Sequence, residues 1–285
     1  MRLTPSPVSG AARPHKGRPL RLVALAALAP IGIVGSALAA DPDRPFVPGE
    51  TRVGPREALF DGRKPVELRY RFKGPEPLDL RIRVLKASNG KPVQSWVVRD
   101  REPGTGYVRR WNGTNRKGRA VPGGRYRFRF APTGSKRQWR AGSVVLHDHV
   151  YPVDGPHSSR GAIGEFGAPR SGGRIHEGYD VVANCGTPLV ASRGGRVRKA
   201  GYDDSLYGWF VLIDGRKTDL DYFYAHLRTR PAVRRGDRVH TGERIGEVGM
   251  TGNARTTPCH LHFELHGRHG PLDPKPDLRR WDRWS

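Results

Sequence analysis

Apolar and polar residues alternate along much of the chain from residue 66 onward, with the period that places successive side chains on opposite faces of a β-strand. Apolar residues occupy every second position between residues 66 and 72, and residues 80–84 and 125–130 repeat the pattern. Asn89-Gly90 is a typical hairpin turn between two such runs. Short strands separated by Gly- and Pro-rich turns predict a small β-sandwich over residues 64–143.

The two flanking regions differ in pattern. Residues 40–63 are rich in Pro, Gly and charge without clear periodicity, and we interpret them as a linker. Residues 144–285 return to a β pattern, with strands predicted at 209–214 and 219–226. Strict alternation on the second strand places Tyr222, Tyr224 and His226 on one face. No convincing helix exceeds two turns, so the chain is predicted to be all-β with two domains.

Residues 1–39 have the composition of a secretory signal peptide. Basic residues precede an apolar run from Leu22 to Val34. This run is too short to span a membrane comfortably, and Gly and Pro interrupt it. Ala37-Leu38-Ala39 then forms a small-x-small cleavage site. An uncleaved anchor is the alternative, and no other run is apolar enough to span a membrane. We therefore expect an extracytoplasmic protein, secreted or associated with the cell wall.

The chain of 285 residues carries a formal net charge of +24. Residues 1–39 contain five basic and no acidic residues, so their removal leaves +24 − 5 = +19. In an exported protein this charge favours attraction to an anionic cell wall or cell surface. A charge that reflects only solubility and codon usage is the second explanation. Nucleic-acid binding is disfavoured, because no recognised motif accompanies the charge and export opposes it.

The chain has two cysteines, Cys185 and Cys259. An oxidising compartment favours a disulfide between them. The bond would close a loop of about 74 residues, which is worth ~4 kcal/mol in the chain-entropy model. The alternative is that Cys259 is a thiolate ligand, but it directly precedes His260 and would face the other side of a strand.

The segment from Cys259 to Glu264 holds the most informative pattern. On a strand, His260, His262 and Glu264 share one face, while the intervening apolar residues enter a core. Two imidazoles about 6.6 Å apart along a strand can share a metal ion or divide the tasks around one. Glu264 lies further along the strand, and we expect it to support the site from beside the ligands or to be solvated.

A second motif lies at His176-Glu177-Gly178-Tyr179-Asp180. Its first two residues match the helical His-Glu-x-x-His zinc motif, but position 180 is Asp and Gly178 disfavours a helix. In a straight strand His176 and Asp180 would lie ~13 Å apart, so one ion can join them only if the chain bends, as Gly178 permits. A surface turn capped by Asp180 is the alternative.

His176, Asp180 and His262 together make a set of two imidazoles and one carboxylate. Three protein ligands leave the fourth position of a tetrahedral zinc ion open, which is what a catalytic zinc site needs. Such an ion lowers the pKa of its bound water to about 7 and polarises a carbonyl. His226 and His260 on neighbouring strands are then available to take the proton of the water and to stabilise an oxyanion.

These motifs together resemble the lysostaphin-like zinc metallopeptidases, also called LytM-type. The likeness rests on His176-x-x-x-Asp180, on Tyr-Ala-His-Leu at 224–227 and on His-Leu-His-Phe-Glu at 260–264. It extends through residues 186–191 and 242–252 and covers about residues 151–280. Tyr179 departs from the family, which usually has an aliphatic residue there.

The resemblance implies an antiparallel β-sheet, barrel-like peptidase domain of the duplicated hybrid motif type at residues 144–285. It implies one Zn²⁺ per chain, with the ligands His176, Asp180 and His262, and His226 and His260 as the catalytic pair. The implied substrate is a peptide bond of bacterial peptidoglycan, in a stem-peptide cross-link or a glycine bridge. Cys185 and Cys259 are additions to the family pattern and suggest a disulfide that clamps two ligand-bearing segments.

Other residues are candidates for weaker roles. His157, Arg174 and Tyr224 are candidate substrate-binding residues, and Arg160 and Arg170 join Arg174 in a basic cluster that could meet substrate carboxylates or simply be solvated. Residues 84–130 resemble the Ig-like domain of flagellar hook-capping proteins, which implies a structural or spacer role. The alternative to an enzyme is a non-catalytic wall-binding or hydrolase-activating protein on the same fold, as in relatives that lose metal ligands.

Overall fold

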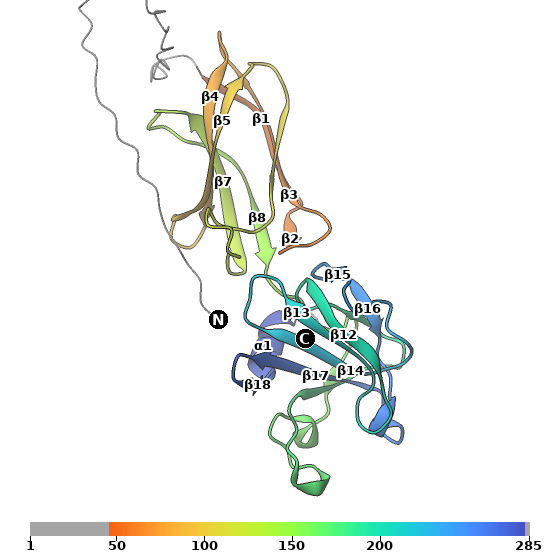
Figure 1. Ribbon diagram of the computed structural model, residues 1–285. Coiled ribbons are helices and arrows are strands. Elements are labelled where there is room, and N and C mark those ends of the chain that lie inside the picture. The colour runs from red at the N-terminus through yellow and green to blue at the C-terminus, as the bar shows by residue number, and fades with distance from the viewer. Residues whose placement is uncertain (1–45, 283–285) are drawn as a thin grey trace, which may run out of the picture. The chain divides into compact units, whose positions relative to one another are not determined.

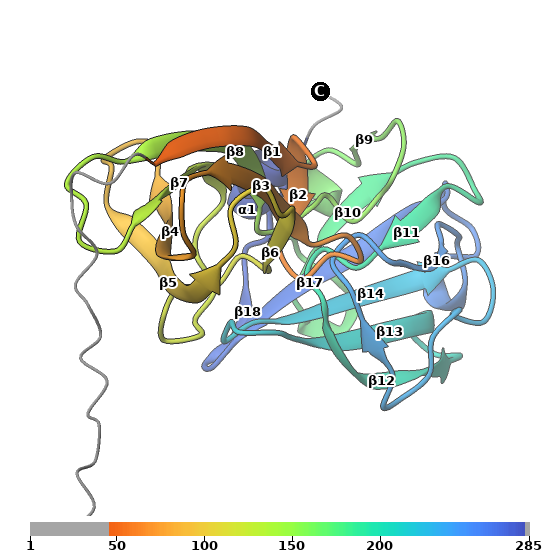
Figure 2. The same ribbon diagram turned by 90° about the horizontal axis from the view of Figure 1, so that it is seen from above.

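The computed structural model describes residues 46–282, so the predicted signal peptide at residues 1–39 lies outside the described residues. The described residues form strands in four sheets with one short α-helix, which confirms the all-β prediction (Figures 1 and 2). Within residues 46–282, no helix has the length and apolar character needed to cross a membrane.

Strands β1 to β8 form two sheets that pack face to face. Their bounds are β1 Val47–Gly54, β2 Glu57–Leu59, β3 Val66–Lys73, β4 Leu78–Lys86, β5 Pro92–Arg101, β6 Tyr107–Trp111, β7 Gly124–Pro132 and β8 Trp139–His147. One sheet has the order β1-β3-β6 and the other the order β2-β8-β7-β4-β5. Trp111 of β6 meets Tyr126 and Phe128 of β7 edge-on, with ring centroids 5.1 and 5.8 Å apart, so one aromatic core joins the sheets.

The segment interpreted as a linker differs from expectation, because β1 and β2 lie inside residues 40–63. β1 contains Pro48 and Gly49, its register with β3 shifts between Pro48 and Thr51, and none of its residues is fully buried. An edge strand with a bulge has no buried face to impose alternation, so backbone pairing alone defines it. The other predicted domain boundaries, and the Ig-like resemblance of this part, stay predictions.

The strands from β9 onward build the second part of the chain. Their bounds are β9 Ser158–Ser159, β10 Tyr179–Val182, β11 Pro188–Val190, β12 Gly195–Asp203, β13 Gly208–Gly215, β14 Asp221–Leu227, β15 Arg238–Val239, β16 Arg244–Glu247, β17 His260–Gly267 and β18 Gly270–Leu272. Three 3₁₀ turns, η1 Ala162–Gly164, η2 Ser171–Gly173 and η3 Gly252–Ala254, and the helix α1 Lys275–Trp281 complete it. The strands predicted at residues 209–214 and 219–226 correspond to β13 and β14.

The large sheet has the order β15-β12-β13-β14-β17-β10-β9, with β18 paired to β17, while β11 and β16 form a separate pair. β17 therefore lies between β14 and β10. Leu261, Phe263 and Leu265 of β17 are fully buried in a hydrophobic cluster that also contains Trp281 of α1. The alternation predicted for this strand is confirmed, and its histidines occupy the face opposite the core.

Candidate metal and catalytic site

Three side chains meet on the face of the sheet opposite the core. Asp180 of β10 is paired in register with His262 of β17, and His176 lies in the segment just before β10. Asp180 Oδ1 lies 3.0 Å from both His176 Nε2 and His262 Nδ1, and these two nitrogens lie 2.8 Å apart. The structure thus brings together the three residues proposed as metal ligands.

A glycine allows this approach. A Cβ atom at Gly178 would lie 2.6 Å from the carbonyl oxygen of Phe263 and 2.8 Å from His262 Cε1. Any larger residue would push the segment before β10 away from β17. Gly178 was expected to permit a bend, and the structure adds that it permits close contact between backbone and ligand.

Hydrogen bonds fix which nitrogen each ligand imidazole presents. His176 Nδ1 donates to the carbonyl of Glu165 at 2.8 Å, and His262 Nε2 donates to Glu264 Oε1 at 2.7 Å. The lone pairs of His176 Nε2 and His262 Nδ1 therefore point at each other and at the Asp180 carboxylate. Three acceptors in mutual contact require a cation or a proton between them.

The donor set fits zinc. Donors around a tetrahedral zinc ion lie about 3.3 Å apart, given zinc–ligand distances of ~2.0–2.1 Å. The observed separations of 2.8–3.0 Å need to widen by only a few tenths of an ångström. Zinc ions in proteins are commonly bound by two imidazoles and one carboxylate. The outer nitrogen of each imidazole then usually donates to a carboxylate or a carbonyl, as it does here.

The electrostatics of the cluster also favour a cation. Burial raises the pKa of the Asp180 carboxyl, but its bonds to His176 and His262 outweigh burial and hold the pKa well below its usual range. Burial likewise raises the pKa of Glu264, yet its bonds to His262 and His266 bring it down to about 2. Two ionised carboxylates thus lie on either side of His262. Burial lowers the pKa of His262, and these carboxylates raise it to about 9, so the cluster holds a proton where a metal can replace it.

Glu264 contributes more than the sequence indicated. We expected it beside the ligands or solvated, and it is 2% exposed and bonded to His262. Its second oxygen accepts a hydrogen bond from His266. The alternation identified its face, but only the structure shows that its side chain reaches back along the strand to the ligand.

His226 reaches the site by a departure from regular strand geometry. Alternation placed it on the face of Tyr222 and Tyr224, which is incorrect, because both tyrosines are buried in the core whereas His226 lines the groove with His260 and His262. The φ of His226 is 61°, and the β13–β14 register shifts between Trp209 and Val211, opposite this end of β14. This bulge turns the imidazole to the other face, where its ring centroid lies 4.9 Å from that of His260 and 5.8 Å from that of His262.

His226 and His260 carry the same tautomer. Nδ1 of His226 donates to the carbonyl of Thr251 at 2.9 Å, and Nδ1 of His260 donates to the carbonyl of Pro258 at 2.8 Å. Burial, reinforced by the charges of the neighbouring imidazoles, lowers the pKa of His226 to about 3. Burial also lowers the pKa of His260. Both rings are therefore neutral near pH 7, with Nε2 as a proton acceptor.

These residues line a groove of about 680 Å³, in which basic residues form part of one wall. Arg160 Nη1 donates to Asp180 Oδ2 at 3.0 Å and approaches His260 Nε2 at 3.4 Å. Arg170 lies 3.6 Å from the same carboxylate oxygen. Arg174, a candidate substrate-binding residue, also lines the groove.

The other two candidate substrate-binding residues lie elsewhere. Tyr224 is fully buried, and its hydroxyl accepts a hydrogen bond from the backbone N–H of Ser192 at 2.8 Å. His157 stacks on Tyr151 with ring centroids 4.0 Å apart and lies 3.4 Å from Asp282. Neither side chain lines the groove, so both interpretations were wrong. A polar aromatic side chain that is buried in a core or stacked on another ring forms its hydrogen bonds inside the protein. The sequence does not reveal which partners it finds there.

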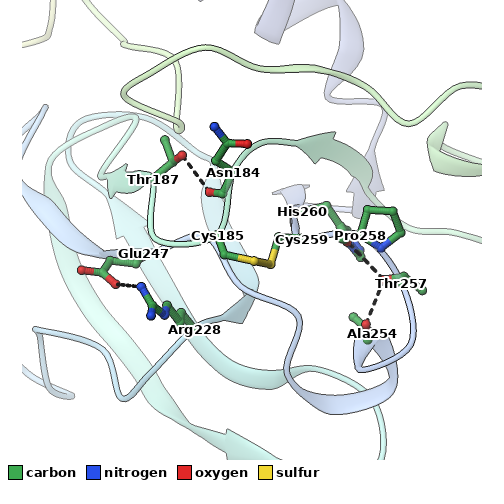
Figure 3. The surroundings of a disulfide bond; sticks show 10 residues. All are labelled: Asn184, Cys185, Thr187, Arg228, Glu247, Ala254, Thr257, Pro258, Cys259 and His260. Carbon is green, nitrogen blue, oxygen red and sulfur yellow. Dashed lines mark hydrogen bonds and ion pairs between the residues drawn. A yellow bond between two sulfur atoms is a disulfide. The ribbon is translucent and has the colours of Figure 1, made fainter.

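The disulfide predicted from the cysteine count is present. Cys185 and Cys259 are bonded, with their Cα atoms 5.3 Å apart, which excludes Cys259 as a thiolate ligand. Cys185 follows β10 and Cys259 immediately precedes β17. Figure 3 shows the bond joining the segment of Asn184 to the segment of Pro258 and His260. The bond therefore ties together the ends of the two strands that carry Asp180 and His262.

Comparison with known proteins agrees with the motif analysis. The model of the family described as "Peptidase family M23" matches residues 174–274. The chain is 32% identical over 159 residues to the L-Ala--D-Glu endopeptidase of Bacillus subtilis (strain 168), which covers 50% of this chain and 47% of that protein. It is also 32% identical over 150 residues to the murein hydrolase activator NlpD of Salmonella dublin, which covers 50% of this chain and 36% of the activator.

The chain thus spans less than half the length of these curated relatives. Among solved structures, it is similar to the catalytic domain of the antimicrobial peptidase lysostaphin from Staphylococcus simulans. That match has 28% identity and a TM-score of 0.38, and it covers 44% of this chain and 92% of the other.

Proposed function

Because the chain belongs to peptidase family M23 over residues 174–274, we propose that it is a zinc endopeptidase that cleaves peptide cross-links of bacterial peptidoglycan outside the cytoplasm. The observation that carries this proposal is one groove containing three converging metal donors and two neutral imidazoles. The similarity to an L-Ala--D-Glu endopeptidase supports peptidoglycan as the substrate.

His176, Asp180 and His262 would hold the zinc ion, and Glu264 would orient His262 through its Nε2–H. A bound zinc ion supplies an acidified water and polarises the carbonyl of the scissile bond. The disulfide between Cys185 and Cys259 would help to keep the strands of Asp180 and His262 in register when the ion is bound.

His260 and His226 would act as the proton acceptor and the oxyanion-stabilising group of the reaction. Each has Nε2 as its acceptor nitrogen, since each Nδ1–H is held by a backbone carbonyl. Arg160 Nη1 lies 3.4 Å from His260 Nε2 and would have to move away before His260 takes a proton. We assign His260 as the base that takes the proton of the attacking water. His226 becomes a donor to the tetrahedral oxyanion only as it takes up a proton, because its neutral tautomer has no N–H directed into the site.

The basic wall of the groove would bind the substrate. Arg174 is exposed along the groove and is placed to meet a carboxylate of a stem peptide. Arg160 holds the outer oxygen of Asp180, so its first role is to position that carboxylate. The net charge, +24 for the full chain and +24 − 5 = +19 without residues 1–39, would add a general attraction to an anionic wall.

The test measures zinc and hydrolysis separately. Purified protein should contain about one zinc per chain and release new amino groups from peptidoglycan, and a chelator should abolish the release. His262→Ala should lose both zinc and cleavage. His260→Ala should keep the zinc and lose at least about 10²-fold in rate. His269→Ala, an exposed histidine outside the groove, is the matched control and should change neither.

The alternative is an activator of other wall hydrolases, which the similarity to a murein hydrolase activator favours. A wild-type protein that binds zinc and cleaves no wall preparation, but accelerates a separate amidase or peptidase, would replace the enzyme proposal. Fragments released from walls of known cross-bridge chemistry, identified by mass spectrometry, would name the bond that is cut.

A further inference from the structure

The outer face of the five-stranded sheet carries a dense group of arginines, far along the chain from the proposed active-site residues. The inward side chains of β4 and β7, such as Ile82 and Phe128, are buried in the core. The alternate positions of β4 and β7, together with one position of β8, form what we term the arginine face: Arg81, Arg83, Arg125, Arg127, Arg129 and Arg140.

Three of these arginines form a row across adjacent strands. Arg83 of β4 is paired directly with Arg129 of β7, and Arg129 is paired directly with Arg140 of β8. Like charges at directly opposite positions destabilise a sheet. The cost is greater here because none of the six arginines forms an ion pair with any residue in 46–282.

Two arginines of the other sheet in this part of the chain are paired with an acid. In the other sheet, Arg69 and Arg110 share the carboxylate of Glu67, at 2.7 and 3.0 Å. Asp79 of β4 is the acidic residue nearest in sequence to Arg81 and Arg83 on this face. Its carboxylate accepts a hydrogen bond from the backbone N–H of Asp100. The arginine face therefore keeps its positive charge for an external anion.

The row borders a recess. Arg81, Arg83 and Arg129 line a cavity of about 70 Å³, closed on one side by Gly134, Ser135 and Gln138 of the β7–β8 loop. A recess of this size admits a single small oxyanion. Guanidinium groups match the oxygens of phosphate in paired hydrogen bonds, better than lysine does.

We propose that the arginine face binds a phosphodiester-linked anionic polymer of the cell envelope, with one phosphoryl group in the recess. A polymer fits better than a free anion because Arg125, Arg127 and Arg140 continue the charge beyond the recess. The choice of an envelope polymer over nucleic acid rests on the proposed function at the wall. Binding there would concentrate the peptidase domain on its substrate.

The test compares two variants with equal loss of charge. In Arg81→Gln/Arg83→Gln/Arg129→Gln the recess loses its cations, while Arg230→Gln/Arg234→Gln/Arg235→Gln removes three exposed charges outside both the groove and the recess. Co-sedimentation with isolated cell walls measures affinity. The recess variant should bind at least about tenfold more weakly, and the control should stay within about threefold of wild type.

Removing the phosphodiester polymers from the walls with hydrofluoric acid should weaken wild-type binding as much as the recess substitutions do. The same treatment should have little further effect on the recess variant. Equal losses in the two variants, or unchanged binding to stripped walls, would overturn the proposal. Tighter recess-dependent binding to duplex DNA than to walls would overturn it in favour of nucleic acid.

A stability measurement guards against misfolding of the variant. Inorganic phosphate should raise the melting temperature of wild type and of the control, and not that of the recess variant. The recess variant should itself melt no lower than wild type, because like charges are removed. Hydrolysis of a soluble peptide substrate should be equal in wild type and both variants. Recess-dependent wall binding by a protein without hydrolytic activity would refute the proposed function and leave this inference standing.

Discussion

At the scale of single residues, His226 shows where sequence reasoning succeeds and where it stops. The Tyr-Ala-His-Leu motif identified it as a site residue, while alternation assigned it to the core face. Its φ of 61° resolves the conflict, since a left-handed residue in a bulge interrupts the alternation and turns its own side chain to the opposite face. Alternation cannot detect such a residue, because nothing in the type of residue 226 requires a positive φ.

This conformation predicts an unusual order of stabilities. A positive φ reduces the folding stability by about 1 kcal/mol or more when the residue has a Cβ atom, and it does not do so for glycine. We expect His226→Gly to be more stable than His226→Ala by about 1 kcal/mol in denaturant unfolding, although both lose activity. At an ordinary strand position the alanine variant would be the more stable one, and that result would contradict the bulge.

Glu264 supports a second prediction at the residue scale. Loss of its charge removes the acceptor that holds the Nε2–H of His262. Substitutions of such outer partners typically weaken metal binding by about 10–100-fold. Glu264→Gln should therefore lose zinc to a competing chelator in that range. Glu177→Gln, the same chemical change in the same groove, is the control, and equal weakening in both variants would contradict a specific role for Glu264.

At the scale of elements, the site follows from the pairing of β10 with β17. The sequence predicted β17 correctly because its apolar and polar residues alternate without interruption, and Leu261 and Phe263 are fully buried as expected. It could not predict that Asp180 stands directly opposite His262, since register depends on backbone pairing between segments about 80 residues apart. The same limitation hid β1, which no buried face marks.

The disulfide is the covalent counterpart of this pairing. It spans 74 residues, so its loss should destabilise the peptidase part by up to ~4 kcal/mol in the chain-entropy model. We expect Cys185→Ser, Cys259→Ser and the double variant to be equally destabilised in non-reducing denaturant unfolding, because each removes the same bond. Reductant should lower wild type to the level of the variants and should not affect the double variant. A double variant as stable as oxidised wild type would show that the strands hold their register without the bond.

At the scale of the whole molecule, the all-β prediction is confirmed, while the predicted division into domains stays a prediction. The buried residues in 46–282 form two hydrophobic clusters. One contains residues between 46 and 146 and the other residues between 153 and 281. The destinations of Tyr224 and His157 were not predictable, because both are polar aromatic residues whose partners, Ser192 and Tyr151, come from other segments. The hydrophobic pattern of a sequence therefore predicts which residues are buried more reliably than it predicts which residues they contact.

Two cores and one metal site predict how the molecule unfolds. A ligand that binds only the folded state stabilises it by RT ln(1 + [L]/Kd), about 2.7 kcal/mol when free ligand is at 100 times Kd. All three donors belong to the part with the second cluster, so zinc should raise one of two calorimetric transitions and leave the other in place. Reductant should lower the same transition, since the disulfide lies in that part too. His262→Ala should abolish the zinc response and keep the reductant response, whereas a zinc-induced shift of both transitions would mean that the two cores unfold as one unit.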